Sequence, residues 1–405
     1  MNEVNQKLSI RWVYMVIGVI AMLFAGVLYA WSILKSPLSA EFGWGVSDLA
    51  LNFTLAMTFF CIGGLLGAQI SKRLGHRVAL ITAGAFAAAG FMLTAALKDI
   101  SVLLLYLTYG LLAGIGIGIA YNVVIATVSA WFPDKKGLCS GCLMMGFGAS
   151  ALVLGNLADA MFKSTLGWRV TYILLGGAIF VVLALAGVIL KKPGADTILP
   201  QATAKKAANT APTQDLTAKQ MLCTPAFWLA FLCISFLAAV GSSVISFAKD
   251  LALSVNAPEA LAVSLVGILS VCNGLGRILT GAVFDVIGCR KTMICANLLT
   301  ICAAMVTLIA VWVGSLMLCI IGVCLTGMSY GTVPTNTSAF ASAFYGTEHF
   351  GTNLSVLNFN LMLASFMATA CSAIRTATGG YVVPFAILLG MASLALVLNI
   401  SVKKP

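Results

Sequence analysis

The chain has 405 residues, of which 61% are hydrophobic and only 9% are charged, and its mean hydropathy is +1.05. Soluble domains carry about 25% charged residues, so this composition excludes a soluble globular protein and indicates a protein that lies mostly in lipid. The net charge of +11 would suit a nucleic-acid partner. It also suits the excess of Lys and Arg that membrane proteins keep on the cytoplasmic side.

Twelve apolar stretches are long enough for the roughly 20 residues of a membrane-spanning helix. They lie near residues 12–33, 48–71, 78–97, 101–128, 139–161, 170–190, 226–248, 260–282, 293–313, 315–338, 351–373 and 380–402. The sequence before the first stretch lacks the pattern of a cleaved signal peptide, so we expect the first span to be retained.

The basic residues fix the expected orientation. With the N-terminus inside, sixteen of the 23 Lys and Arg fall on the inward side, six fall on the outward side, and Arg277 lies within a span. The sequence therefore predicts an all-α protein with twelve helices in the cell inner (cytoplasmic) membrane and both termini in the cytoplasm. This distribution explains the charge, so we expect the lipid bilayer and no nucleic acid as a partner.

One stretch, residues 191–220, breaks the apolar pattern and is rich in Ala, Thr, Pro and Lys, as is typical of a linker. We therefore predict an N-terminal six-helix bundle over 1–190, a cytoplasmic linker over 191–225 and a C-terminal six-helix bundle over 226–405. We expect the chain to act as a monomer.

The two halves have similar sequences at corresponding loops. "SAWFPDKKGLCSG" (129–141) follows the fourth span and "SAFYGTEHFGTNL" (342–354) follows the tenth. Likewise "SKRLGHR" (71–77) follows the second span and "FDVIGCR" (284–290) follows the eighth. Two such matches favour a duplicated six-helix unit, as in transporters built from parallel repeats.

The chain lacks the residues that several classes of function need. The chain has no GxxxxGK[ST] motif for nucleotide binding, and no stretch is long enough for a soluble signalling domain. Its two histidines, His76 and His349, lie in expected cytoplasmic loops, which disfavours a membrane-embedded enzyme. The twelve cysteines fall in expected spans or on the cytoplasmic side and favour no disulfide framework. We expect neither a metal ion nor a cofactor.

Arg277 lies inside an apolar span, eight residues before Asp285. At a rise of about 1.5 Å per residue, its Cα is about 12 Å from the cytoplasmic face. An Arg near the bilayer centre costs roughly 2.5–3.5 kcal/mol on insertion scales, and its guanidinium stays charged. The acidic residues of the expected spans lie at the membrane faces or at the outer ends of the spans. We therefore expect a substrate carboxylate, held by two hydrogen bonds, to be its counterion. The alternative is an arginine that packs helices through backbone carbonyls or Asn side chains.

The loop after the eighth span resembles the G-x-x-x-D-x-x-G-x-[RK] signature of the major facilitator superfamily, a large family of transporters. Gly281, Asp285, Gly288 and Arg290 fit that pattern and are implied to form a cytoplasmic gate motif. The first-half copy departs from it, with Ala68 for the first Gly and Lys72 for the Asp. The first half therefore lacks the acidic residue of the signature.

A narrower resemblance, to the oxalate/formate antiporter family and the related monocarboxylate transporters, runs from the first to the eleventh span. It is carried by "GVLYAWSIL" (26–34), "GIGIAYNVVIATVSAWFPDKKGLCSG" (116–141), "NGLGRILTGAVFDVIG" (273–288) and "GMSYGTVPTNTSAFASAFYGT" (327–347). It implies two six-helix bundles around a midplane cavity that opens alternately to each side, and an organic anion bound by Arg277.

The resemblance also implies further residues of a substrate site. We expect the site to include Arg277, Tyr29, Tyr121, Tyr330, Asn358, Asn360, Trp31 and Asn122. For each tyrosine, the alternative is a packing or interface residue. The family's oxalate-handling members carry a lysine in the eleventh span, where this chain has Leu361. A single fixed cation suits one carboxylate, so a monocarboxylate such as formate, acetate, lactate or pyruvate is favoured over a dicarboxylate such as oxalate.

The sequence leaves the energy source open between exchange of anions, proton symport and facilitated movement. Related eukaryotic carriers have an acid one turn before the arginine, where this chain has Asn273. Asp250, at the outer end of the seventh span, is the remaining candidate for coupling. The expected partners are therefore a small organic anion and, if transport is by symport, a proton.

Overall fold

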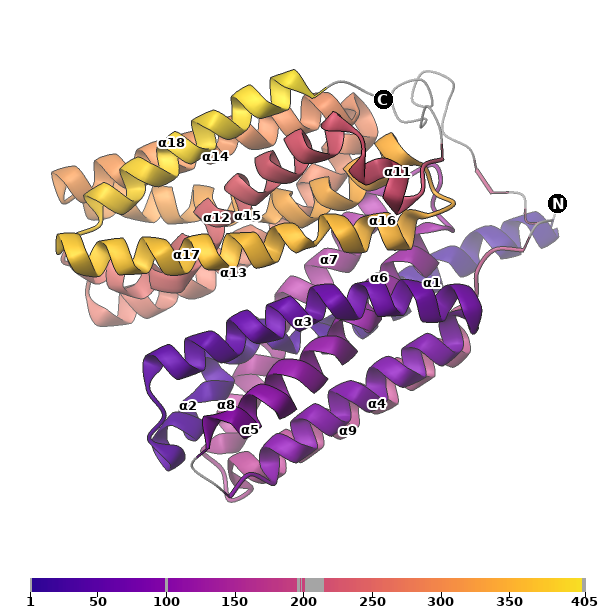
Figure 1. Cartoon of the computed structure of the whole chain (residues 1–405), viewed down its shortest axis with the longest axis horizontal. Coiled ribbons are helices and arrows are strands. Elements are labelled where there is room, and N and C mark those ends of the chain that lie inside the picture. Colours follow the sequence, from indigo (N-terminus) through magenta and orange to yellow (C-terminus); the bar gives the residue numbers. More distant parts are fainter. Residues whose placement is uncertain (1, 99–100, 195–196, 198, 201–214, 403–405) are drawn as a thin grey trace. The chain divides into compact units, whose positions relative to one another are not determined.

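The computed structural model describes residues 2–98, 101–194, 197, 199–200 and 215–402, and all regular elements within them are helices (Figure 1). Twelve helices in this part of the chain are long and apolar enough to cross a membrane. They are Ser9–Phe42, Leu51–Arg73, Gly75–Ala95, Val102–Ser129, Lys136–Phe162, Gly167–Ile189, Pro225–Ile245, Ser264–Ile287, Cys289–Val313, Leu316–Tyr345, Phe350–Thr378 and Val382–Ser401. Each overlaps one predicted span, so the prediction of an all-α protein with twelve spans is confirmed.

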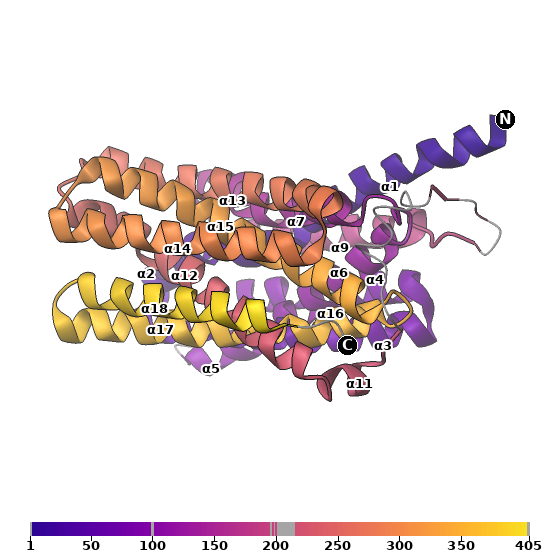
Figure 2. The ribbon, with the colours of Figure 1, turned by 90° about the horizontal axis from the view of Figure 1, so that it is seen from above.

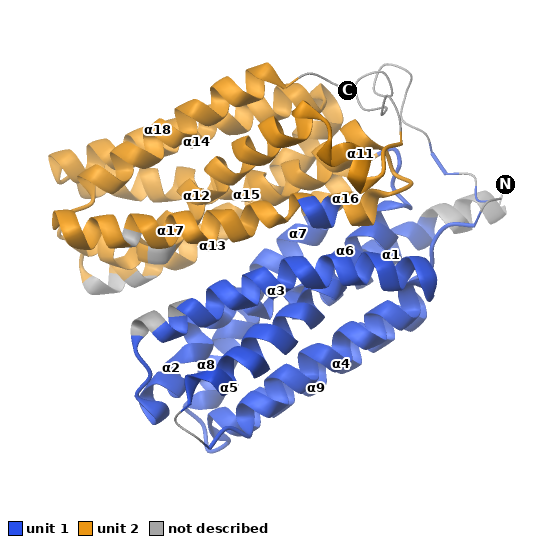
Figure 3. Ribbon diagram, viewed as in Figure 1, with its two compact units in different colours: residues 1–134, 142–201, 354–356 blue, residues 135–141, 202–353, 357–405 orange. Residues whose placement is uncertain are grey.

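The chain divides into two compact units that exchange two short segments (Figure 3). Unit 1 contains residues 1–134, 142–201 and 354–356, and unit 2 contains residues 135–141, 202–353 and 357–405. Of the predicted linker, 191–225, residues 195–196, 198 and 201–214 lie outside the described part of the chain. The predicted division into 1–190 and 226–405 stays a prediction.

Unit 1 holds the first six spans, three of which are built from more than one helical segment. Its elements are α1 (Asn2–Ala25), the 3₁₀-helix η1 (Gly26–Ala30), α2 (Trp31–Phe42), α3 (Val46–Arg73), α4 (Gly75–Ala95), α5 (Val102–Leu105), the π-helix η2 (Tyr106–Ala113), α6 (Gly114–Ser129), α7 (Lys136–Ser150), the π-helix η3 (Ala151–Gly155), α8 (Asn156–Phe162) and α9 (Gly167–Ile189). The first six residues of α7 belong to unit 2.

Unit 2 holds the other six spans and a short helix that precedes them. Its elements are α11 (Ala218–Leu222), α12 (Pro225–Ser254), α13 (Glu259–Ile287), α14 (Cys289–Val313), α15 (Leu316–Tyr345), α16 (Phe350–Leu357), α17 (Phe359–Thr378) and α18 (Val382–Ser401). Residues 354–356 of α16 belong to unit 1. The last two helices, α17 and α18, lie next to each other in Figure 2, and both pack against α12.

The two units repeat the same pairs of packed helices. In unit 1, α3 packs against α6 and α4 packs against α9; in unit 2, α13 packs against α15 and α14 packs against α18. Counted as spans within each half, these are the second with the fourth and the third with the sixth. The repeated pairing is what a duplicated six-helix unit would produce.

Backbone irregularities interrupt several spans. The first changes to a 3₁₀-helix at Gly26, where a Cβ would overlap the Phe147 carbonyl oxygen. The fourth and fifth contain π-helical turns, and α12 leaves helical geometry at Phe247. The eleventh span breaks at Asn358, between α16 and α17. Such irregular turns are frequent where helices bend or bind ligands.

Candidate functional site

Arg277 is buried in α13, where only 1% of its surface is exposed. Its Nε–H donates to the Asn273 side-chain oxygen, at 3.1 Å and one helical turn earlier. An i, i+4 pair lies on one face of a helix, so the two side chains present a joint polar patch. The bond to an asparagine is one that the packing alternative also predicts. Because Asn273 is neutral, the pair keeps the full positive charge of the guanidinium.

The backbone around Arg277 is fixed by close helix contacts. A Cβ on Gly331 of α15 would overlap the Asn273 carbonyl oxygen and would lie 3.0 Å from the Arg277 nitrogen. Thr335, one turn further along α15, donates its hydroxyl to the Arg277 carbonyl at 3.3 Å. A Cβ on Gly141 would lie 2.5 Å from the same carbonyl oxygen. Small residues at these positions let the backbones approach and hold the arginine in one place.

The other predicted site residues of unit 2 lie on α15 and at the break between α16 and α17. Tyr330, which is 8% exposed, precedes Gly331 and packs so closely on Gly241 of α12 that a Cβ there would overlap its ring. Asn358 and Asn360 are both buried. The Asn360 amide donates to the Leu357 carbonyl at 2.6 Å, so it satisfies the backbone where the helix breaks.

Two predicted tyrosines of unit 1 meet around a residue that sequence reasoning missed. The rings of Tyr29 and Tyr121 each contact the Phe147 ring edge-on, with centroids 5.1 Å apart. Phe60 joins the same group, with its ring centroid 5.1 Å from that of Tyr121. Phe147 lies in "GFGAS" (146–150), a stretch whose glycines indicate close packing, but nothing in the sequence ties its ring to the two tyrosines.

The remaining predicted residues of unit 1 have structural partners. The Trp31 indole donates to the Leu49 carbonyl at 2.9 Å, and its ring lies 4.4 Å from that of Tyr109. The Asn122 amide donates to the Ser355 hydroxyl at 2.7 Å. Trp31 and Asn122 are both buried. These bonds fit a supporting role beside a site better than direct contact with a ligand.

The proposed coupling residue, Asp250, lies near the end of α12 and forms an ion pair with Arg375 of α17, at 3.4 Å. Its side chain is 54% exposed, so water screens the pair. The Arg375 guanidinium also lies 4.5 Å from the centre of the Tyr381 ring. Burial raises the pKa of Tyr381 to about 12, so its phenol stays protonated at neutral pH.

The gate motif lies at the turn between α13 and α14. The two Asp285 oxygens accept the N–H groups of Gly137 and Leu138, each at 2.9 Å, at the beginning of α7. A carboxylate is favourable there because the N–H groups of a first helical turn lack intrahelical partners. Gly281 lies against the Gly137 carbonyl so closely that a Cβ would overlap it.

The turn itself depends on Gly288, whose φ of +81° favours glycine. Arg290, which follows it, donates to the Ile400 carbonyl at 3.1 Å. In the first-half copy, Gly75 has the equivalent φ of +87°, while Lys72 is exposed. The turn geometry is therefore shared by both copies, but the acidic residue occurs only in the second.

The cysteines and histidines of the described part of the chain do not gather into a metal-binding cluster. Among the residues it describes, no group of three or more His, Cys, Asp or Glu side chains could hold a metal ion. Cys139 and Cys142 have the Cys-x-x-Cys spacing at the beginning of α7, but no disulfide joins them. Two thiols alone fall short of the four ligands of a structural zinc site.

A family model described as the Major Facilitator Superfamily matches residues 16–369. The chain belongs to the Major Facilitator Superfamily. Solved structures of that superfamily have the same fold. The proton:xylose symporter XylE has a TM-score of 0.76 at 17% identity, with 98% of this chain and 96% of XylE covered. FucP in its outward conformation has a TM-score of 0.70 at 12% identity, with 96% and 99% covered.

Curated relatives within the superfamily are more similar in sequence. The oxalate:formate antiporter of Oxalobacter formigenes is 30% identical over 289 residues, which cover 70% of this chain. The uncharacterized MFS-type transporter YhjX of Escherichia coli (strain K12) is 26% identical over 278 residues, or 68% of this chain. Monocarboxylate transporter 3 of Rattus norvegicus is 27% identical over 286 residues, which cover 66% of this chain and 56% of the relative. The match spans just under two thirds of YhjX and of the antiporter, 66% and 65% respectively.

Proposed function

We propose that this member of the superfamily is a secondary transporter of small organic anions, most of all monocarboxylates, that works by alternating access in the cytoplasmic membrane. The observation that carries the proposal is the buried guanidinium of Arg277, hydrogen-bonded to the neutral amide of Asn273. Burial makes each bond to a bound anion stronger than it would be in water, and the planar guanidinium fits a carboxylate with two bonds.

Five acidic residues in the described part of the chain have partners at the ends of helices. Glu41, Asp134, Asp159 and Asp250 form ion pairs with Arg169, Arg11, Lys163 and Arg375, respectively. Asp285, on the helix of Arg277, accepts two backbone N–H groups at the beginning of α7. We propose that the substrate carboxylate binds the Arg277 guanidinium beside the neutral Asn273 amide.

The decisive experiment is uptake of labelled formate, acetate, lactate, pyruvate and oxalate into proteoliposomes. We expect Arg277→Ala to lower monocarboxylate uptake by about a hundredfold or more, since a buried charged contact is worth about 2–5 kcal/mol. Arg73→Ala removes an exposed arginine at the end of α3 and serves as the matched control. If a folded Arg277→Ala protein still takes up monocarboxylates at the wild-type rate, Arg277 does not bind the substrate.

A dicarboxylate exchanger is the second candidate, favoured by the 30% identity to the oxalate:formate antiporter. The buried Leu361 argues against it, because an apolar side chain leaves the second carboxylate of a dianion without a counterion. We expect Leu361→Lys to shift the preference toward oxalate by about tenfold, the value of one charge-assisted hydrogen bond. Leu361→Met is the matched control. Wild-type protein that moves only oxalate would reverse the assignment.

For coupling, we propose Asp250 as the proton-linked residue. Its bond to Arg375 joins α12 to α17, so protonation of the carboxylate would release a contact between two spans. We expect Asp250→Asn to abolish the stimulation of uptake by an inward proton gradient and to leave exchange of labelled for unlabelled substrate intact. Unchanged stimulation in this variant would show that the proton is carried elsewhere.

A further inference from the structure

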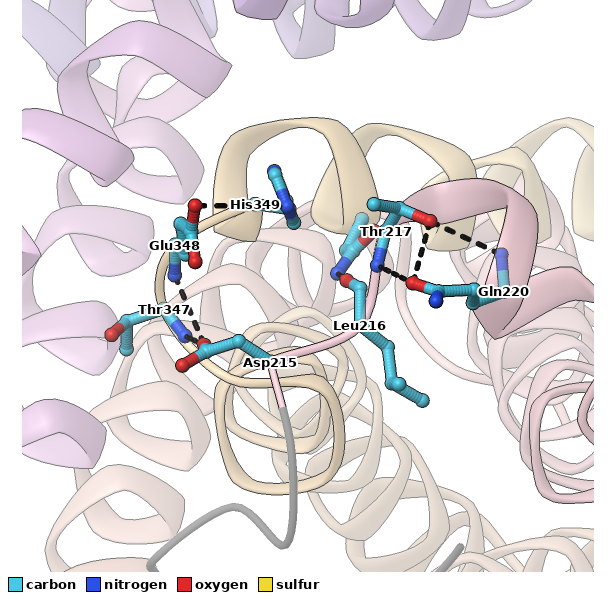
Figure 4. A network of polar contacts seen from close by, with 8 residues as sticks. Asp215, Leu216, Thr217, Gln220, Thr347, Glu348 and His349 are labelled. Carbon is cyan, nitrogen blue, oxygen red and sulfur yellow. Dashed lines mark hydrogen bonds and ion pairs between the residues drawn. The ribbon is translucent and has the colours of Figure 1, made fainter.

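A network of hydrogen bonds ties the residues directly before α11 to the loop between α15 and α16 (Figure 4). The Asp215 carboxylate accepts the backbone N–H groups of Thr347 and Glu348, at 2.8 and 3.2 Å. The Leu216 N–H donates to the Tyr345 carbonyl at 3.1 Å. All of these groups belong to unit 2.

The carbonyl of Leu216 completes the attachment, since it accepts the Asn353 side-chain amide at 2.9 Å. Thr217 and Gln220 then begin α11 with a reciprocal cap, in which the Thr217 hydroxyl accepts the Gln220 N–H and the Gln220 side chain accepts the Thr217 N–H. A cap of this kind stabilises the first turn of a helix. The segment is therefore fixed on both sides of Leu216.

The loop is shaped to receive a carboxylate. Gly346 ends α15 with a φ of +78°, which favours glycine, and a Cβ there would overlap the Asp215 carboxylate. The next two N–H groups point at that carboxylate (Figure 4). Successive N–H groups in such a turn form an anion-binding nest. The Lys136 ammonium also interacts electrostatically with Asp215.

In unit 1, the loop between the fourth and fifth spans is also bound by a charged side chain, but that side chain is basic. Asp134 is the fifth residue after Ser129, as Thr347 is the fifth after Ser342 in the matching second-half sequence. The Arg11 guanidinium binds both Asp134 oxygens, at 2.8 and 3.3 Å. In unit 1 a charged residue near the beginning of the first span, and in unit 2 a charged residue ahead of the first span, thus bind the same position of the loop between the fourth and fifth spans.

We propose that residues 215–220 form a strap, in which Asp215 is a positioning residue for the span made of α16 and α17. The strap attaches the C-terminal part of the linker to the loop that leads into this span. The linker would therefore restrain this span as well as connect the two halves. The two helices meet at Asn358, a proposed substrate residue. Movement of α16 during a transport cycle therefore has to stretch or release the strap. This functional part rests on the proposed transport activity, whereas the attachment itself does not.

Hydrogen exchange of the full-length protein in lipid nanodiscs tests the attachment directly. We expect Asp215→Ala to speed exchange of the Thr347 and Glu348 amides by about tenfold, because each loses a bond to a charged acceptor. Asp215→Asn keeps an acceptor oxygen without the charge, so its effect should be smaller. Glu348→Gln is the matched control, because it removes an acid from the same loop but spares the strap, and it should leave exchange unchanged.

A second measurement reports the opening of the strap itself. Trypsin cleaves after the exposed Lys219 only when α11 opens, and we expect cleavage to be about tenfold faster in Asp215→Ala. Asn353→Ala removes the other side-chain bond of the strap without changing its charge, and it should act in the same direction. If the exchange and cleavage rates stay at the wild-type values in both variants, residues 215–220 do not form the proposed strap.

The positioning role is tested by uptake kinetics. We expect Asp215→Ala to lower the maximal uptake rate several-fold while KM stays the same, with partial recovery in Asp215→Asn. Faster amide exchange combined with a wild-type maximal rate would overturn the positioning role. If the wild-type protein moves none of the acids, the proposed function fails, and the exchange and cleavage rates still decide whether the strap exists.

Discussion

At the scale of single residues, residue 273 sets the charge directly beside the Arg277 guanidinium. Its side-chain oxygen accepts the Arg277 Nε–H and so aligns the guanidinium without neutralising it. An aspartate at this position would form an internal ion pair with the same geometry. If Arg277 binds the substrate anion, as we propose, the change of one atom at residue 273 would place a competing carboxylate beside it.

Asn273→Asp tests this reasoning. The new carboxylate would lie within hydrogen-bond distance of Nε, and in its ionised form it would pair with the guanidinium in place of a substrate anion. We expect monocarboxylate uptake at pH 7.5 to fall by about tenfold or more and to recover as the pH is lowered and the carboxylate is protonated.

Asn273→Leu is the control for this experiment, because it removes the acceptor without adding a charge. Its uptake should be lower than that of the wild type and should lack the recovery at low pH. Equal pH profiles for the Asp and Leu variants would contradict the electrostatic account.

The sequence predicts some of these residues and misses others for a physical reason. Arg277 can be found from sequence because a charge within an apolar span is costly, and Asn273 can be found from its helical spacing. Phe147 and Ser355 cannot, because each matters through contacts with residues distant in sequence. A phenylalanine and a serine in an apolar span are unremarkable until the packing of the helices is known.

At the scale of helices, hydropathy predicts where spans lie but not where they bend. The first span is predicted over 12–33, whereas its helical segments continue to Phe42 and change to a 3₁₀-helix at Gly26. Average hydropathy is insensitive to backbone geometry. The irregular turn arises where Gly26 meets the Phe147 carbonyl, a contact that no local pattern encodes.

The contact between α13 and α15 gives a prediction at this scale. Gly331→Ala would push a methyl group into the backbone of α13 at Asn273, and overpacking of this kind costs about 1–3 kcal/mol. We expect a lower melting temperature for the purified protein and a lower uptake rate, because the α13 segment that carries Arg277 has to shift.

Gly267→Ala is the matched control on α13 itself. An added Cβ at that position meets no atom within 4 Å, and alanine favours a helix over glycine by about 1 kcal/mol. Its melting temperature should equal or exceed that of the wild type. If both variants melt at the same temperature, the close approach of the two helices has no energetic consequence.

At the scale of the whole molecule, one short segment groups with a different unit from its neighbours in sequence. Residues 135–141 belong to unit 2 although their neighbours in sequence belong to unit 1. Asp285 holds them there through the N–H groups of Gly137 and Leu138. A linker can be recognised from composition, but an exchanged segment depends on these contacts and has no compositional signal.

The distribution of basic residues predicts the orientation of the whole chain in the membrane, with Cys223 on the cytoplasmic side. Cys223 is exposed and lies between α11 and α12, within the predicted linker. We expect a membrane-impermeant maleimide to label it in inside-out vesicles and not in intact cells, as measured by mass spectrometry of the peptide that contains it. Cys223→Ser identifies this peptide by its loss of label. Labelling from outside intact cells would reverse the orientation. It would also move the gate motif and the Asp215 strap to the outer face, because both lie at the same end of their spans as the linker.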